Sequence, residues 1–290
     1  MIKLLFYRDY NFGDNLSRFI VEKVSDMEVL PKNMYNPSIL WQVKTMLKCL
    51  LHWNWSFFRE VLFFYEKPVM AIGSILCQGN YHTKVWGSGF MNRDEKFRGG
   101  IIYALRGKHS YNMLKAQGVD TDCRVFGDPA FLLPLFIAPS SNKKYEVSII
   151  PHFSEYDFFS KTYSGKYHVI DLSGNHIQRV VDEITASKVI LSTSLHGIIV
   201  AHAYGIPALW IKKGNIETDG VKFYDYFSSV DIKEYDGFVF SEVLHDNGII
   251  FNTFEKYQSS SLPRKDVSMI QKELLEVAPF PVRKELLAKK

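Results

Sequence analysis

The sequence predicts an α/β protein made of two parallel-sheet domains that face each other across a cleft. Three observations support this prediction. The chain of 290 residues is too long for one small core. Short apolar runs alternate with polar loops and amphipathic segments, as in strand–helix–strand units. A polar, turn-rich segment at 138–144 separates two such halves, and the loops at the carboxyl ends of their strands are expected to line the cleft.

The first half, residues 1–139, is predicted to be the N-terminal domain. Gly118 marks the end of one helix, because glycine favours the position just after a helix. The apolar runs end in glycine or polar residues, so polar loops are expected at the carboxyl ends of the strands. Strands are expected at 1–7, 69–76, 84–87, 101–105 and 124–126, and helices at 16–25 and 109–117.

The second half, residues 145–262, repeats this alternation and is predicted to be the C-terminal domain. Strands are expected at 147–150, 167–171, 188–191 and 206–211, and helices at 177–186 and 196–204. Residues 263–290 follow as a tail, in which 264–275 has the pattern of one amphipathic helix. We expect this tail to pack back on the N-terminal domain.

Composition excludes several classes of protein. The formal net charge of +4 is dispersed, whereas a nucleic-acid-binding face needs clustered basic residues. The three cysteines, Cys49, Cys77 and Cys123, form no C-x-x-C pair, which argues against a disulfide framework or a zinc ribbon. No H-x-x-H pair or carboxylate cluster suggests a metal site. Arg8 and Asp9 end the first apolar run too early for a signal peptide, so a cytoplasmic protein is expected.

The segment 44–67 is very apolar, contains Trp53 and Trp55, and carries basic residues. An interfacial helix that contacts an anionic membrane surface has this composition. One or two helices that cover the first sheet have it as well. The sequence leaves both interpretations open, and peripheral contact with the inner face of the cell membrane is the functional one.

The most informative motif lies at 188–210, where a buried strand is followed by hydroxyl side chains and a helix. Ser192, Thr193 and Ser194 lie where they can cap free N–H groups or bind an anion at the helix start. His196 is placed in the first turn, and Gly197 allows close approach of backbone or ligand. The alternative is an ordinary capped helix with a packed histidine.

Four further motifs follow predicted strands. Residues 11–16 supply Asn11, Gly13, Asp14 and Asn15, whose polar groups suit sugar hydroxyls. Residues 103–108 bring Arg106 and Lys108 to one sheet edge, and arginine suits carboxylate or phosphate. The other two are Gly127-Asp128-Pro129 and the strand end at 149–152, which carries His152. Each has a structural alternative, such as a helix cap or a surface ion pair.

Together and in this order, the motifs resemble those of the polysaccharide pyruvyl transferase family. The resemblance spans nearly the whole chain. It implies the GT-B-like fold, with two Rossmann-like domains, the first for the acceptor and the second for the donor. The motifs are NFGDNL at 11–16, GSIL at 73–76, GSGF at 87–90, ALRG at 104–107, GDPAFLLP at 127–134, IIPH at 149–152, STSLHG at 192–197 and KFYDYF at 222–227.

The resemblance also implies an activity: transfer of a pyruvyl group from phosphoenolpyruvate to a sugar of a capsule or exopolysaccharide repeat unit, with a cyclic ketal as product. The acceptor sugar is then free or lipid-linked, and phosphoenolpyruvate is a co-substrate, with no cofactor required. The implied catalytic residues are His196, Asp14 and His152. Expected donor-binding residues are Arg106, Lys108, Ser192, Thr193, Ser194, Gly197, Lys212 and Lys222, and expected acceptor-binding residues are Asn11, Gly13, Asp14, Asn15 and Ser88.

One position departs from the family pattern. Many relatives carry arginine two residues before the motif histidine, and this chain has Ser194 there. We expect the missing cation to be supplied by Arg106, Lys108, Lys212 or Lys222. Two other functions stay open: a GT-B glycosyltransferase that uses a nucleotide sugar, and a non-catalytic sugar-binding relative.

Overall fold

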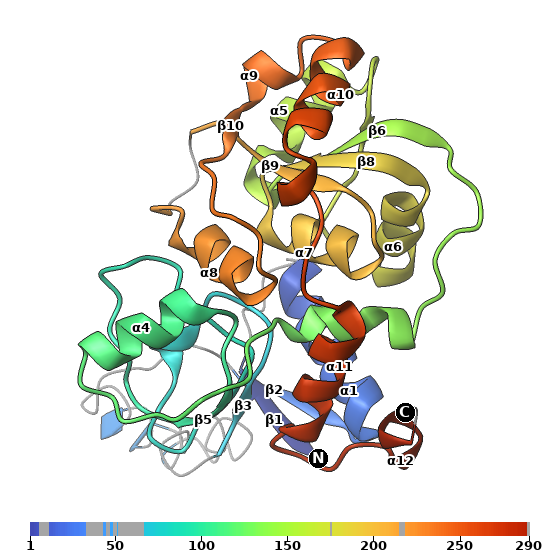
Figure 1. Cartoon of the computed structure of the whole chain (residues 1–290). Coiled ribbons are helices and arrows are strands. Elements are labelled where there is room, and N and C mark those ends of the chain that lie inside the picture. Colours follow the sequence, from blue (N-terminus) through green and yellow to red (C-terminus); the bar gives the residue numbers. More distant parts are fainter. Residues whose placement is uncertain are drawn as a thin grey trace.

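The computed structural model describes residues 1–5, 12–32, 43–44, 47–48, 51, 67–174, 176–214 and 218–288. Its strands form two parallel sheets of five strands each, with helices packed on them (Figure 1). The α/β class and the two sheets predicted from the sequence are therefore confirmed. The GT-B arrangement and the open cleft stay predictions.

The first sheet has the strand order β2-β1-β3-β4-β5. Its strands are β1 (Ile2–Leu5), β2 (Val29–Lys32), β3 (Val69–Met70), β4 (Lys84–Trp86) and β5 (Ile101–Ala104). Helix α1 (Phe12–Ser25) follows β1, helix α4 (Lys108–Ala116) follows β5, and the short helix η2 (Leu76–Gln78) follows β3. Leu16, Ile20 and Val24 of α1 are buried at helical spacing, so this face of the helix packs inward.

The second sheet has the order β10-β9-β8-β6-β7. Its strands are β6 (Tyr145–Ile150), β7 (His168–Val169), β8 (Ser187–Ser192), β9 (Ala208–Lys212) and β10 (Phe238–Val239). The helices of this half are η4 (Phe153–Glu155), α5 (Tyr156–Tyr163), α6 (Ile177–Thr185), α7 (Leu195–Ala203), α8 (Val221–Ser229), α9 (Phe240–Val243), α10 (Asn247–Lys256) and η5 (Gln258–Ser260).

Both sheets share one topology, because in each the first strand of the half lies between the second and the third. Leu5 of β1 pairs with Met70 of β3, and Ile150 of β6 pairs with Ser192 of β8. In open parallel sheets, ligands bind outside the carboxyl ends of the strands at this reversal of strand order. The topology therefore selects the ends of β1, β3, β6 and β8 as the places for a site.

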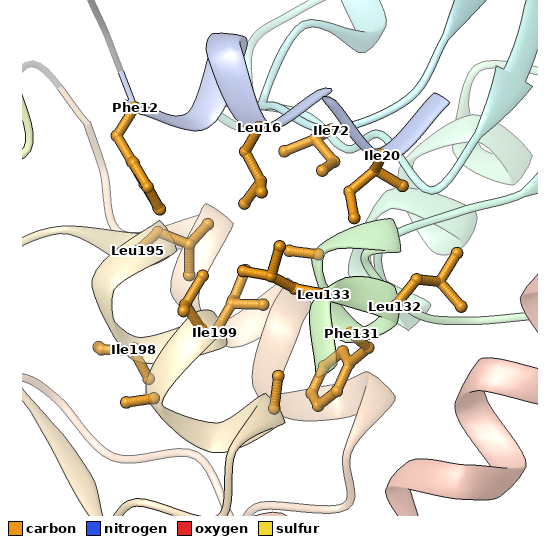
Figure 2. Close-up of a cluster of buried hydrophobic side chains, with 14 of the residues drawn as sticks. Phe12, Leu16, Ile20, Ile72, Phe131, Leu132, Leu133, Leu195, Ile198 and Ile199 are labelled. Carbon is orange, nitrogen blue, oxygen red and sulfur yellow. The ribbon is translucent and has the colours of Figure 1, made fainter. Parts of the chain in front are cut away.

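A continuous hydrophobic core joins the two halves. The short helix η3 (Pro129–Leu135) contacts both α1 and α7, and its Phe131, Leu132 and Leu133 are fully buried. Figure 2 shows Phe12 and Leu16 of α1 directed toward Leu195 and Ile199 of α7, with Leu133 beside them. Apolar contacts therefore set the position of one half against the other.

The C-terminal tail crosses back to the first half. The tail helices are α11 (Val267–Glu276) and α12 (Lys284–Leu287). The indole N–H of Trp86 donates to the carbonyl of Leu274 at 2.9 Å, and the amide of Arg283 donates to the carbonyl of Val24 at 2.9 Å. Helix α11 also contacts η3, so the tail covers the first sheet after the chain has completed the second.

Several elements differ from the sequence-based prediction. The predicted strand at 124–126 contributes only a single bridge, between Leu105 and Phe126. The strand predicted at 69–76 is ordered as β3 only to Met70, and Gly73 has a φ of 125°, which a strand does not adopt. Strand β2 was missed because Pro31 interrupts its apolar pattern.

Most of the segment 44–67, with Trp53 and Trp55, lies outside the described residues, as does Asn11. No helix among the described residues has the length and apolar character that crossing a bilayer requires.

Candidate functional site

The starts of α1 and α7 meet, and this contact joins the switch points of the two sheets. A Cβ atom built on Gly13 would lie 2.3 Å from Nδ1 of His196. Real Cβ atoms do not approach a ring nitrogen so closely, so the imidazole of one half fits against the backbone of the other only because residue 13 is glycine. Two motifs 183 positions apart, at Gly13 and His196, therefore form one site.

The loop between β8 and α7 is held by its hydroxyl groups. Ser192 Oγ donates to the carbonyl of Ile150 at 2.7 Å and accepts from the amide of Ser194 at 3.0 Å. Thr193 Oγ1 accepts from the amide of His152 at 2.7 Å, which ties the ends of β6 and β8 together. Ser194 is the N-cap residue of α7, yet its side chain makes no capping hydrogen bond. The helix therefore begins without a side-chain cap at its positive end.

Gly197 lies one residue after His196, on the face of α7 that packs on the second sheet. A Cβ atom there would lie 2.6 Å from Ser192 Oγ and 2.8 Å from Ile150 Cγ2. Glycine is thus needed for α7 to lie this close to β6 and β8. Gly197 therefore helps to position His196, the residue before it in the helix.

His196 is a neutral histidine in cationic surroundings. Burial, as the largest cause, and the positive charges of Arg106 and Lys222 and the nearby His152 together lower its pKa to about 3. Its Nε2 is buried, and no described residue forms a hydrogen bond with it. A neutral imidazole with an unpartnered ring nitrogen is equipped to accept a hydrogen bond or a proton from a bound molecule, or to donate one to it.

Lys222 supplies a buried amine whose positive charge acts on His196. It lies in the first turn of α8, and only 4% of the residue is exposed. Burial, as the largest cause, and the charge of Arg106 lower its pKa while Glu155 raises it, and the net value is about 8. No described residue offers its Nζ an acceptor at hydrogen-bonding or ion-pair distance; the amine lies 5.4 Å from the ring centre of Phe223. At neutral pH this is a buried cation near an aromatic ring, with no ion-pair or hydrogen-bond partner among the described residues.

His152 follows the end of β6 and interacts electrostatically with both His196 and Lys222. Its Nδ1 shares a hydrogen bond of 2.8 Å with Ser154 Oγ. Burial, as the larger cause, and the charge of Lys222 together lower its pKa to about 4. His152 is thus also neutral, beside a positive charge.

Glu155 completes this cluster and was missed by the sequence analysis. It lies at the end of η4, three residues after His152, and is 3% exposed. Neither of its carboxylate oxygens has a hydrogen-bond partner among the described residues. Its only sequence signal is an acidic residue closely following a strand end, and burial of that residue could not be foreseen.

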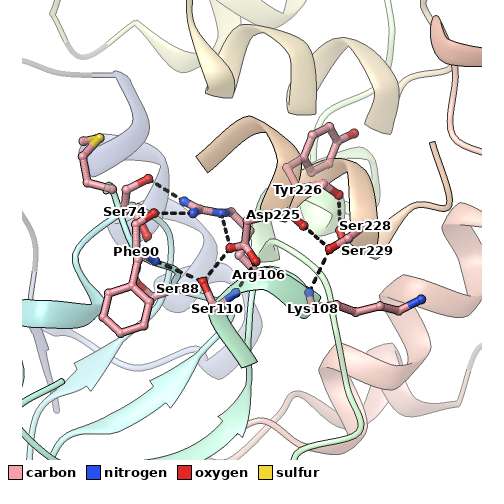
Figure 3. A network of polar contacts seen from close by, with 12 residues as sticks. Ser74, Ser88, Phe90, Arg106, Lys108, Ser110, Asp225, Tyr226, Ser228 and Ser229 are labelled. Carbon is pink, nitrogen blue, oxygen red and sulfur yellow. Dashed lines mark hydrogen bonds and ion pairs between the residues drawn. The ribbon is translucent and has the colours of Figure 1, made fainter. Parts of the chain in front are cut away.

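Arg106 makes a different set of contacts from those expected. Its residue is fully buried, and its Nε pairs with Asp225 Oδ2 of α8 at 3.0 Å (Figure 3). Its Nη2 donates to the carbonyl of Phe90 at 2.6 Å, and its Nη1 donates to Ser74 Oγ. The guanidinium therefore joins the two halves, and its charge reaches the His196 region electrostatically.

Asp225 receives further hydrogen bonds from the start of α4. The amide of Ser110 donates to its Oδ1 and the hydroxyl of Ser110 to its Oδ2, both at 2.7 Å. A Cβ atom on Gly107 would lie 1.7 Å from the carbonyl oxygen of Asp225. The glycine that follows Arg106 thus allows α8 to approach the first half closely enough for this pair to form.

Four other predicted residues lie elsewhere or serve other contacts. Ser88 is buried and donates to the carbonyl of Gly73 at 2.7 Å. Lys108 is exposed and its Nζ lies 3.6 Å from Asp231, while Lys212 pairs with Asp236 at 2.6 Å. Asn15 donates to the carbonyl of Gly174 at 3.1 Å, which ties α1 to the loop after β7.

Asp14 is largely buried in the first turn of α1, next to Gly13. Within the described ranges, no group of three or more histidine, cysteine, aspartate or glutamate side chains is placed to hold a metal ion. The structure thus brings Gly13, Ser192, Thr193, Ser194, Gly197, His152 and His196 together, with Lys222 and Arg106 close enough to act on them electrostatically.

Part of the chain matches a known protein family. Residues 102–212 match the polysaccharide pyruvyl transferase family. The match includes Arg106, His152 and the segment from Ser192 to Gly197, so the resemblance drawn from the motifs is confirmed for this part of the chain. It indicates a transferase that acts on polysaccharide.

A second similarity covers nearly the whole chain. An uncharacterized protein of Acanthamoeba polyphaga mimivirus is 26% identical over 292 residues, which cover 96% of this chain and 91% of that protein. No solved structure matches significantly. Outside 102–212, the roles of Gly13, Lys222 and Asp225 in a pyruvyl transferase site therefore depend on their geometry.

Proposed function

We propose that this protein transfers a pyruvyl group from phosphoenolpyruvate to a saccharide and forms a cyclic pyruvate ketal. The single observation that carries the proposal is the cationic environment of His196, whose Nε2 has no hydrogen-bond partner among the described residues. His196 is neutral, lies at the uncapped start of α7, and is acted on by the positive charges of buried Lys222 and Arg106. Phosphoenolpyruvate has a phosphate and a carboxylate, and both are stabilised by such groups.

The chemistry of ketal formation suits a neutral histidine. An acceptor hydroxyl adds to C2 of phosphoenolpyruvate while C3 takes a proton, and a second hydroxyl then displaces phosphate from C2. Each hydroxyl must lose its proton as its oxygen forms the new bond. His196 is unprotonated at neutral pH, and the negative charge of bound phosphoenolpyruvate would raise its low pKa toward the range in which it can accept that proton. The same ring, once protonated beside the bound anion, can return the proton to C3.

In this proposal, the remaining residues of the site divide into a donor-binding group and an acceptor-binding group. Lys222, Arg106 and the loop from Ser192 to Ser194 lie on the donor side, with His152 as a second proton carrier. The start of α1, with Gly13, Asp14 and Asn15, lies on the acceptor side in this proposal. Asp14 is a further candidate base there.

A binding comparison tests the donor. Isothermal titration of the purified protein with phosphoenolpyruvate and, separately, with a nucleotide sugar should show binding of phosphoenolpyruvate. Lys222→Gln should weaken this binding about tenfold or more, since a charge-assisted contact contributes roughly 1.5–3 kcal/mol. Lys188→Gln is the matched control, because Lys188 is 52% exposed and pairs with Glu146. Binding of the nucleotide sugar alone would instead support a glycosyltransferase.

We also propose peripheral contact with an anionic membrane through the segment 44–67, where a lipid-linked acceptor would be met. Of the described residues in this segment, Leu47 and Leu51 are 56% and 76% exposed, four positions apart, and Lys44 and Lys48 are exposed beside them. Flotation with anionic vesicles should show binding that falls with salt and with Lys44→Glu and Lys48→Glu combined. Absence of binding at low salt would refute this contact.

A further inference from the structure

Glu155 is a buried carboxylate that the transfer chemistry outlined above leaves without a role. It is 3% exposed, and both of its oxygens lack a hydrogen-bond partner among the described residues. A buried carboxylate without hydrogen bonds is costly, because it has lost water and gained nothing in exchange. Such a group is expected to receive its partner from a bound molecule.

The surroundings of Glu155 define what that molecule is. Its charge raises the pKa of Lys222, so the two groups act on each other, yet they form no ion pair within 4.0 Å. Both are buried, and among the described residues neither has a hydrogen-bond or ion-pair partner. A carboxylate repels the phosphate and carboxylate of phosphoenolpyruvate, whereas it accepts hydrogen bonds from neutral hydroxyls. The amine of Lys222 has the opposite preference and attracts an anion.

We propose that Glu155 is an acceptor-binding residue that holds a hydroxyl of the saccharide beside the anion bound by Lys222. This inference rests on the proposed function. It identifies the end of β6, through η4, as part of the acceptor subsite in the second half of the chain. The acceptor would then lie between α1 of the first half and η4 of the second, with His196 between them.

In this proposal, the pair of opposite charges orders two substrates within one site. Lys222 selects the anionic donor, and Glu155 keeps that donor from occupying the hydroxyl position. A saccharide with two neighbouring hydroxyls satisfies Glu155 with one of them and presents the other toward the donor. Such a substrate has the two nucleophiles that a cyclic ketal requires.

The test separates binding of the donor from binding of the acceptor. Wild type, Glu155→Gln and Lys222→Gln are titrated with phosphoenolpyruvate alone, and their kinetics are then measured against the saccharide acceptor at saturating phosphoenolpyruvate. Glu155→Gln should bind phosphoenolpyruvate as tightly as wild type or tighter. Its KM for the acceptor should rise about tenfold, because a hydrogen bond to a charged group is replaced by a weaker one to a neutral group. Lys222→Gln should show the reverse pattern.

Control measurements exclude a loss of structure. Glu146→Gln serves as the matched variant, because Glu146 is 59% exposed on β6. Glu155→Gln should melt at or above the wild-type temperature, since it removes an unpaired buried charge. Unchanged acceptor KM, or weakened phosphoenolpyruvate binding in Glu155→Gln, would overturn the assignment while leaving the proposed function intact. Failure of the wild type to bind or consume phosphoenolpyruvate would overturn both.

Discussion

At the scale of single residues, the site is defined by side chains that lack partners. His196 Nε2 and both oxygens of Glu155 are buried without hydrogen bonds among the described residues. Lys222 is 4% exposed, and its amine has no acceptor at hydrogen-bonding distance in the described part of the chain. Their unfavourable burial is maintained by the packing around them. By contrast, the hydroxyls of Ser192 and Thr193 form hydrogen bonds within the protein and hold the loop between β8 and α7 in place.

Replacement of His196 tests its part in proton transfer. His196→Ala should lower turnover by about 10²–10⁴-fold, the usual contribution of a general acid–base group. Since Nε2 makes no hydrogen bond in the described structure, the variant should keep its fold, as judged by circular dichroism. His245→Ala is the control, because the His245 side chain is 74% exposed. Wild-type turnover in His196→Ala would show that the ring serves only packing.

The pH dependence of donor binding tests Lys222. Its pKa is lowered to about 8, so the amine is charged below pH 8 and becomes neutral as the pH rises through that value. The KM for phosphoenolpyruvate should therefore rise between pH 7.5 and about pH 9. Lys222→Arg should abolish this rise, because guanidinium stays protonated throughout the range. The same rise in Lys222→Arg would assign it to another group.

At the scale of elements, the proposed site depends on the contact between the starts of α1 and α7. The sequence analysis found both motifs and gave each a function, because each follows a strand end and opens a helix. It could not show that they touch, since that depends on how the two sheets are placed by the core at η3. The first helix was also predicted to start at residue 16, so Gly13 was assigned to a loop, whereas it lies in the first turn.

Enlarging residue 13 tests this contact. Gly13→Ala places a methyl group 2.3 Å from His196 Nδ1, so the imidazole must move. A displacement of about 1 Å in such a group can cost about 10²-fold in turnover. Gly165→Ala is the matched control, because nothing lies within 4 Å of the added carbon.

A double-variant cycle shows whether the effect of Gly13→Ala passes through His196. When His196 is already alanine, Gly13→Ala should cause little further loss of turnover, because the ring it displaces is absent. Independent, multiplying losses would mean that residue 13 acts on the acceptor directly and that the ring contact is incidental.

At the scale of the whole molecule, the halves are joined by apolar packing and by one buried ion pair. The sequence predicted two alternating sheets and the break near 138–144, because strand–helix alternation and turn residues are local signals. It placed Arg106 on the donor because arginine suits carboxylate or phosphate, and it gave a surface ion pair as the structural alternative. The structure pairs Arg106 with Asp225, 119 positions away, and no local pattern contains that contact.

Breaking the pair should destabilise the fold. Asp225→Asn leaves the fully buried guanidinium of Arg106 without its counter-charge, and loss of one partner of a buried pair costs about 3–5 kcal/mol. Denaturant unfolding measures this free energy. Lys108→Ala is the comparison, since the Lys108–Asp231 pair is exposed at 57% and 59% and should contribute less than about 1 kcal/mol. Equal effects of the two variants would contradict the structural role of Arg106.

The central claim is that the cluster around His196 and Lys222 transfers a pyruvyl group to a saccharide, and mass spectrometry of the product tests it most directly. Candidate saccharides, free and lipid-linked, are incubated with the protein and phosphoenolpyruvate. The account predicts a product heavier by pyruvic acid less one water, formed together with an equal amount of phosphate and absent with His196→Ala. A product that gains a sugar unit from a nucleotide sugar, with phosphoenolpyruvate left unconsumed, would contradict it.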